Sequence, residues 1–389
     1  MFLDFHYYAT YCAAYLAGYT HEESLDVAYA AQFVDCCTLT LLKKLKGPKA
    51  AVTTQYIAEM VDDTEDYIGL QRITRIWSAY HFLPYDLYAK SKKRPKRYMD
   101  RYRLICEPNG DLLIETVNLA KDRDLTAVGL AMHVLADTWA HRHFAGVGSN
   151  VINDINPYFY ELIDDENETT TERLVEFRHA PGGDDFEHSR YNNSIGQDSE
   201  ASIMCIGHGR LGHMPDYSFI RYKYMPAWGD YEVIVKDNPS DYYHAFCQMI
   251  YAMKYLRGEH PAFDKDVYDF DAVKPWEDEI KAMLLTRQYD HEKEWKEMCS
   301  KISGHDVEDF DIDKYQQEYI DAGETGADGT FLGRFFINAM RQKSMVTHRI
   351  FESGNLLAGF SVDYKTEGFK GIKDFGKLLE SMRGGKDND

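Results

Sequence analysis

Two histidines and an aspartate spaced four residues apart, His133, Asp137 and His141, are the strongest indication of chemistry in this chain. On an α-helix, residues four apart are rotated by only about 40°, so these side chains project from one face. Their surroundings are apolar, with Leu135 and Trp139 as neighbours. Burying imidazoles and a carboxylate there is unfavourable without a compensating partner, and a divalent cation is a suitable one. The pattern therefore predicts a metal site.

One helix cannot complete a zinc site, because structural zinc takes about four ligands and catalytic zinc about three plus a water. Other nitrogen and oxygen donors, which zinc or another borderline divalent metal accepts, occur elsewhere in the chain. The further candidate ligands are His6, Asp35, His81, His143, His208, His213 and Asp216. His143 lies on the opposite side of an uninterrupted helix, and it reaches the site only if the helix breaks near Arg142 or Gly146.

These motifs resemble those of the zinc-dependent phospholipase C and single-strand nuclease superfamily. That superfamily carries a histidine, an aspartate four residues later and a histidine ten residues after the first, as His133, Asp137 and His143 do here. It also uses an N-terminal histidine, an aspartate, a histidine followed by an aromatic residue, and a late histidine with a carboxylate. In that order the chain has His6, Asp35, His81 with Phe82, and His213 with Asp216. The segments DFHYYATY and HxxxDTWAH also resemble an uncharacterised bacterial family.

The resemblance, which covers about residues 1–220, implies a multi-helix core that holds two or three zinc ions. One ion would take Asp35, His81, His133 and Asp137, a second His143, His213 and Asp216, and a third His6, with Asp137 shared. Superfamily members begin with a tryptophan whose amine binds metal, whereas this sequence begins with Met1. The resemblance leaves two choices open, between His141 and His143 and between His208 and His213.

Metal ions at such a site activate a water for attack on a phosphodiester. We therefore expect a zinc-dependent phosphodiesterase acting on phospholipid or nucleotide, with Asp35 and Asp137 as catalytic carboxylates and Asp35 orienting the water. Arg142 and Arg210, near the ligand motifs, are predicted to bind phosphate oxygens. Two alternatives remain open: an amidase or other ester hydrolase with the same activated water, and a non-enzymatic assembly protein with a structural metal site.

The amino-acid composition argues against some classes of function and some cellular compartments. The net charge is −20, from 64 acidic and 44 basic side chains, which argues against stable binding to duplex nucleic acid. The seven cysteines have no regular spacing, which favours a reducing compartment. The sequence shows no secretion signal and no transmembrane segment, so we expect a cytoplasmic protein. Because an unrestricted phosphodiesterase would harm its own cell, we expect a regulated intracellular effector.

Apolar periodicity and capping residues predict a mainly α-helical fold. The expected helices cover residues 8–17, 20–45, 53–61, 65–82, 111–145, 240–255, 276–301 and 331–351. Asp35 is expected near the core, in the middle of the second helix. Residues 147–239 are rich in Asn, Asp, Gly and Pro and predict a loop-rich insertion. We expect a catalytic core over residues 1–260, a helical extension packed on it over 261–380, and a flexible tail over 381–389.

Overall fold

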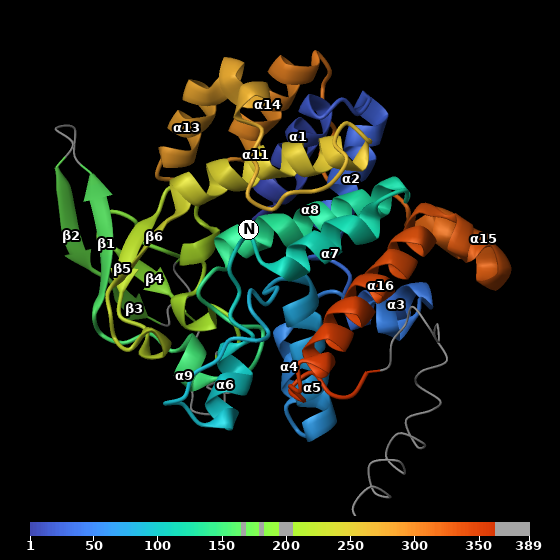
Figure 1. Ribbon diagram of the computed structural model, residues 1–389. Coiled ribbons are helices and arrows are strands. Elements are labelled where there is room, and N and C mark those ends of the chain that lie inside the picture. The colour runs from blue at the N-terminus through green and yellow to red at the C-terminus, as the bar shows by residue number, and fades with distance from the viewer. Residues whose placement is uncertain (165–168, 179–182, 194–204, 362–389) are drawn as a thin grey trace, which may run out of the picture.

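A computed structural model describes residues 1–164, 169–178, 183–193 and 205–361 of the chain. The fold is mainly α-helical, as predicted, with helices gathered around the central helix α8 (Leu125–Ala140) and a small β-sheet at one side (Figure 1). No helix in the described ranges combines the length and the apolar composition that crossing a bilayer requires. The predicted tail, 381–389, lies outside the described residues.

The helices fall into two groups along the chain, one before and one after the sheet. The first group is η1 (Asp4–Ala9, a π-helix), α1 (Thr10–Leu16), α2 (His21–Phe33), α3 (Leu39–Leu45), α4 (Ile57–Asp63), α5 (Tyr67–Tyr80), α6 (Lys96–Tyr102), α7 (Asp111–Ala120), α8 and α9 (Asn150–Asn153). The second group is α11 (Asn238–Leu256), α12 (Phe270–Val273), α13 (Glu277–Leu285), α14 (Glu292–Ser303), α15 (Gln316–Gly326) and α16 (Phe331–Glu352). Short 3₁₀ turns include η4 (Gly209–Leu211) and η5 (Met214–Asp216).

The region predicted as a loop-rich insertion contains a four-stranded antiparallel sheet, which the all-helical expectation missed. Its strands are β1 (Phe159–Asp164), β2 (Thr170–Leu174), β5 (Arg221–Tyr224) and β6 (Ile234–Asp237), in the order β2-β1-β5-β6. Glu161 pairs with Tyr222 across β1 and β5. A parallel pair, β3 (Glu176–Arg178) and β4 (Arg190–Asn192), lies nearby. The buried faces of β1 and β5 join an aromatic cluster that includes Phe159 and Tyr222.

Three predicted helices are each divided in the structure, one of them (276–301) into α13 and α14. The second helix begins with the expected capping box between Thr20 and Glu23, but α2 ends at Phe33 and α3 begins at Leu39. Asp35 therefore lies in the break between two helices rather than inside one. Likewise, residues 111–145 form α7 and α8, because Asp124 caps a new helix by accepting a hydrogen bond from the Thr126 backbone.

Helix α8 is the centre of the core, and all of its residues after Leu125 are buried. It packs against α2, α11, α16 and α7. Gly129 permits the close approach of α2 to α8, because a Cβ atom there would lie 2.2 Å from the Val27 carbonyl oxygen of α2. One hydrophobic cluster extends in sequence from Met1 to Ala358. The segment after residue 260 thus contributes to the same core as the helices that hold the site.

Candidate metal centre

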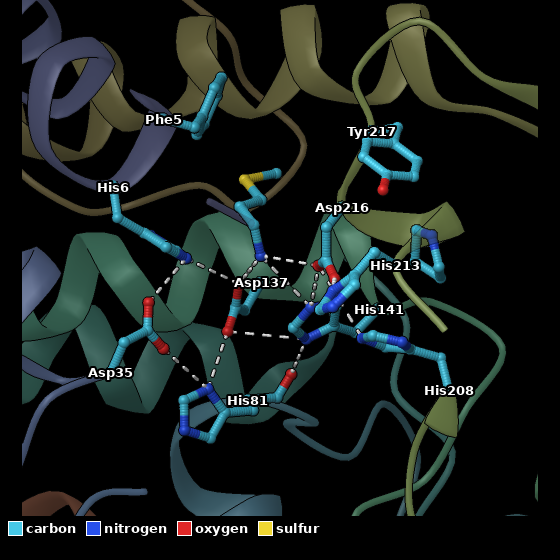
Figure 2. Close-up of polar contacts among 12 residues, drawn as sticks. Phe5, His6, Asp35, His81, Asp137, His141, His208, His213, Asp216 and Tyr217 are labelled. Carbon is cyan, nitrogen blue, oxygen red and sulfur yellow. Dashed lines mark hydrogen bonds and ion pairs between the residues drawn. The ribbon is translucent and has the colours of Figure 1, made fainter. Parts of the chain in front are cut away.

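Asp137 lies at the centre of a cluster of buried histidines. Its side chain is 1% exposed, and its Oδ1 atom lies 3.1 Å from His6 Nε2. Its Oδ2 atom lies 3.1 Å from His81 Nδ1 and 3.2 Å from His133 Nε2. Figure 2 shows the Asp137 carboxylate between His6, His81 and His141. The carboxylate thus joins side chains from three separate segments of the chain.

Four elements supply the donors of this first group. His133 and Asp137 share one face of α8, as the four-residue spacing predicts, and His81 is the C-terminal cap of α5. His6 comes from the π-helix η1, a helix type often found at functional sites. Asp35 completes the group from the α2–α3 break, with Oδ1 3.8 Å from both His81 Nδ1 and His133 Nε2. At 31% exposed, the Asp35 side chain is the solvent-facing member of the group.

A second group of donors lies beyond Asp137. His141, His208 and Asp216 place one donor atom each within 4.8 Å of one another. Asp216 Oδ1 lies 3.2 Å from His141 Nε2 and 3.8 Å from His208 Nε2. His213 also contacts this carboxylate, with Nδ1 3.3 Å from Asp216 Oδ2, but its side chain is 57% exposed. Figure 2 shows His208 and His213 close to Asp216.

The amino group of Met1 lies between the two groups. Its nitrogen is 3.3 Å from Asp137 Oδ1, 3.1 Å from Asp216 Oδ1 and 3.4 Å from His141 Nε2. Burial alone would lower the pKa of this amine, but the carboxylates of Asp137 and Asp216 outweigh burial and raise the pKa to about 11. This amine was not among the donors predicted from the sequence.

Backbone carbonyls fix the orientation of three of the histidines. The Thr53 carbonyl oxygen lies 3.0 Å from His81 Nε2, and the His81 carbonyl oxygen lies 2.9 Å from His141 Nδ1. The Gly212 carbonyl oxygen lies 2.8 Å from His208 Nδ1. Because a carbonyl only accepts hydrogen bonds, each of these nitrogens donates, and the other nitrogen of each ring faces the carboxylates. Histidine ligands of metal ions are commonly oriented in this way.

The charges of the cluster favour a cation. Burial opposes ionisation of Asp137, but His141 and the Met1 ammonium hold the pKa of this carboxyl well below its usual range. The Met1 ammonium and His208 likewise hold the pKa of Asp216 well below its usual range, against the effect of burial. Both carboxylates are therefore ionised at neutral pH.

The histidines contribute lone pairs to this anionic environment. Burial lowers the pKa of His208 to about 4, so the ring is neutral at pH 7 and its Nε2 atom presents a lone pair toward Asp216. A lone pair facing a carboxylate is unfavourable unless a cation lies between them. Burial and His133 also lower the pKa of His6 to about 4. This nitrogen and oxygen donor set fits zinc or another borderline divalent ion.

The structure places His143 outside both groups. Helix α8 ends at Ala140, so the chain has the kind of break that His143 would need to reach the site. However, the backbone then adopts a positive φ of 81° at His143. The ring instead lies beside Glu107, with Nε2 3.5 Å from Oε1, and 5.8 Å from the Trp228 ring. His141, and not His143, is the histidine that contacts Asp216 in the second group.

The two arginines predicted to bind phosphate are paired with other carboxylates. Arg142 lies 3.1 Å from Asp241 and 3.4 Å from Glu107, and it lines a separate cavity. Arg210 lies 3.3 Å from Asp154. Although both arginines lie near the ligand motifs in sequence, their ion pairs are with other carboxylates and not with Asp137 or Asp216.

Comparison with known proteins identifies a family. Residues 1–350 match the model of a family described as a family of unknown function (DUF6765). The chain belongs to this family. The matched region includes every donor from His6 to Asp216 and almost all of α16. No curated protein and no solved structure matches the chain.

Proposed function

We propose that this protein is a metal-dependent hydrolase, most simply a zinc enzyme that cleaves phosphodiesters in phospholipids or nucleotides. The observation that carries the proposal is the orientation of His81, His141 and His208, whose carbonyl-bound rings direct a second nitrogen toward two ionised, buried carboxylates. Without a cation, the neutral His208 ring would face the Asp216 carboxylate with a lone pair, which is unfavourable. Together, the two adjacent groups supply enough donor atoms to bind two or three ions, which is the number that the superfamily resemblance implies.

The chain would hold these ions with residues from both groups. Asp35, His81, His133 and Asp137 would hold one, His141, His208 and Asp216 a second, and His6 with Asp137 and the Met1 amine a third. Bound divalent ions lower the pKa of a water molecule and neutralise charge on a phosphoryl oxygen. Asp35 lies at the solvent edge of the cluster, where its carboxylate would orient the water and accept its proton.

The substrate class rests on the motif resemblance. The charge of −20 favours small or locally bound substrates over duplex nucleic acid. Arg142 and Arg210 are engaged elsewhere, so the bound ions would supply the positive charge for phosphate. A phosphodiesterase inside a cell would need restraint, and we propose that the protein acts as a regulated effector.

Metal analysis combined with a substrate panel tests this function. Protein purified without a metal-affinity tag is analysed for metals, and the same sample is assayed with phosphatidylcholine, single-stranded DNA, cyclic nucleotides and simple esters. We expect two or more zinc equivalents and cleavage of at least one phosphodiester, both lost in His133→Ala and retained in His188→Ala, an exposed histidine outside the cluster. Metal without cleavage would favour a structural site, and ester cleavage alone would favour the amidase or esterase alternative. Absence of metal would overturn the proposal.

A further inference from the structure

Two buried cysteines from distant parts of the chain meet in the core. Cys12 in α1 and Cys299 in α14 are 287 residues apart in sequence, yet their Sγ atoms lie 3.3 Å apart. Both side chains are fully buried. The Cys299 thiol also contacts the Tyr8 carbonyl oxygen at 3.3 Å, and Tyr8 follows His6 by two residues. The pair thus lies where the N-terminal helices pack against α14 (Figure 1).

The geometry is close to that of a disulfide. A disulfide bond is about 2.05 Å long, so the two sulfur atoms need to approach by only about 1.3 Å. At 3.3 Å the two Sγ atoms are already in direct contact, so no group has to leave the space between them. The packing of α1 on α14 and of η1 on α14 holds both backbones in place.

We propose that Cys12 and Cys299 form a disulfide that fastens the N-terminal helices to α14 when the protein meets a disulfide oxidant such as oxidised glutathione. Each thiol gives up its hydrogen as the new S–S bond forms. The S–S bond of oxidised glutathione breaks in the same exchange, and two molecules of reduced glutathione leave. This inference does not depend on the proposed hydrolase function.

Burial determines when the bond forms. Burial, together with Cys299, raises the pKa of the Cys12 thiol well above its usual value, so little thiolate exists in the closed protein. Exchange therefore takes place during folding or during local opening of α14. Once formed, the bond closes a loop of nearly 290 residues and restricts the unfolded chain. For a chain of this size we expect the midpoint of thermal unfolding to rise by about 5 °C.

The experiment uses the full chain. One sample is held with oxidised glutathione about 5 °C below its unfolding midpoint, where local opening is frequent, and another is held with dithiothreitol. Free thiols are then alkylated under denaturing conditions, and unreduced digests are analysed by mass spectrometry. We expect a single major cross-linked peptide pair, containing Cys12 and Cys299, only in the oxidised sample. Full alkylation of both cysteines in that sample, or a cross-link to another cysteine instead, would overturn the proposal.

A stability measurement adds an independent readout. The oxidised wild-type protein should unfold at a higher temperature than the reduced protein, and this difference should vanish in Cys12→Ala and Cys299→Ala. Cys247→Ala, which changes a buried cysteine in α11, is the matched control and should keep both the difference and the cross-link. An unchanged difference in Cys12→Ala would contradict the proposal. The cross-link map of the wild-type protein decides the question if a variant fails to fold.

Discussion

Asp137 Oδ1 lies 3.1 Å from His6 Nε2, across 131 residues of sequence. This contact joins the N-terminal π-helix to the central helix and aligns a buried carboxylate with a histidine that is neutral at pH 7. It also brings the Met1 amine beside the same oxygen. The candidate centre is therefore an assembly of elements that are distant in sequence.

Replacing Asp137 with Asn should greatly weaken metal binding. The substitution keeps the shape of the side chain but removes the charge that faces His6 and His81. Loss of a central ligand should lower zinc affinity by at least about 10-fold. Zinc content and calorimetric titration measure this effect. Asp266→Asn, in an exposed loop, is the control and should bind zinc as the wild-type protein does; equal affinities for Asp137→Asn and wild type would remove Asp137 from the ligand set.

The neighbouring histidines His141 and His143 should behave differently. His141→Ala removes a nitrogen that lies 3.2 Å from Asp216, whereas His143→Ala alters a ring beside Glu107. We therefore expect His141→Ala to lose about one zinc equivalent and His143→Ala to lose none. Metal analysis of the two purified variants, with circular dichroism to verify folding, makes the comparison. The reverse order would return His143 to the site.

Glu107 should make stability depend on pH. Burial, opposed by Arg142, raises the pKa of Glu107 to about 7, from an ordinary value of 4.5. Between these values the folded state retains a proton that the unfolded state has lost, so the free energy of unfolding decreases as pH rises through this interval. The decrease attributable to this group is about 3 kcal/mol. Urea unfolding of wild type and Glu107→Gln at several pH values should show it as a changing difference, and parallel curves would contradict it.

Gly129→Ala should destabilise the protein severely. An added Cβ would lie 2.2 Å from the Val27 carbonyl oxygen, and backbone of α2 must then move away from α8. Overpacking of this kind costs about 3 kcal/mol, and it would also disturb the helix that carries Asp137. Denaturant unfolding measures the loss. Gly329→Ala provides the comparison, because no atom lies within 4 Å of the position that an added Cβ would take there, and it should change stability little.

The effector proposal leads to a test in cells. Induced expression of the wild-type protein should arrest or kill the host, because unrestrained phosphodiester cleavage damages lipid or nucleotide pools. His133→Ala should be harmless at the same protein level. His133 belongs to both three-residue donor sets of the first group, one with His6 and Asp137 and one with Asp35 and His81. Colony counts with matched immunoblots measure the difference. If both proteins are tolerated equally, the effector role loses its support.

The sequence predicted the parts of the centre that depend on helical spacing. The face shared by His133 and Asp137 follows from the 3.6-residue period, and the motif order of the superfamily resemblance singled out His6 and Asp35. The position of His141 relative to His143 could not be predicted, because it depends on a positive φ at a non-glycine residue after the helix end. The Met1 amine was not counted as a donor, because the metal-binding amine of the superfamily belongs to a tryptophan and this sequence begins with Met1.

The sheet was missed for a different reason. Its strands are only four to six residues long, and β2 is almost entirely exposed, so it lacks the regular alternation of buried and exposed residues. A signal was present in Arg221-Tyr-Lys-Tyr224, where charged and aromatic residues alternate and the two tyrosines are buried. In two of the three divided helices, 20–45 and 111–145, a new helix begins at a capping residue, Thr38 or Asp124, whose side chain accepts a backbone hydrogen bond.

The segment that carries His6 is held by residues made much later in synthesis. The Asp4 carboxylate accepts a hydrogen bond from the His291 backbone, and the Tyr8 hydroxyl donates one to Asp309. A ribosome-bound chain that lacks these late residues cannot anchor its first turn, so the nascent protein would remain inactive until translation is nearly finished. Under the proposed hydrolase function, delayed maturation of this kind would protect the producing cell while the protein is being made.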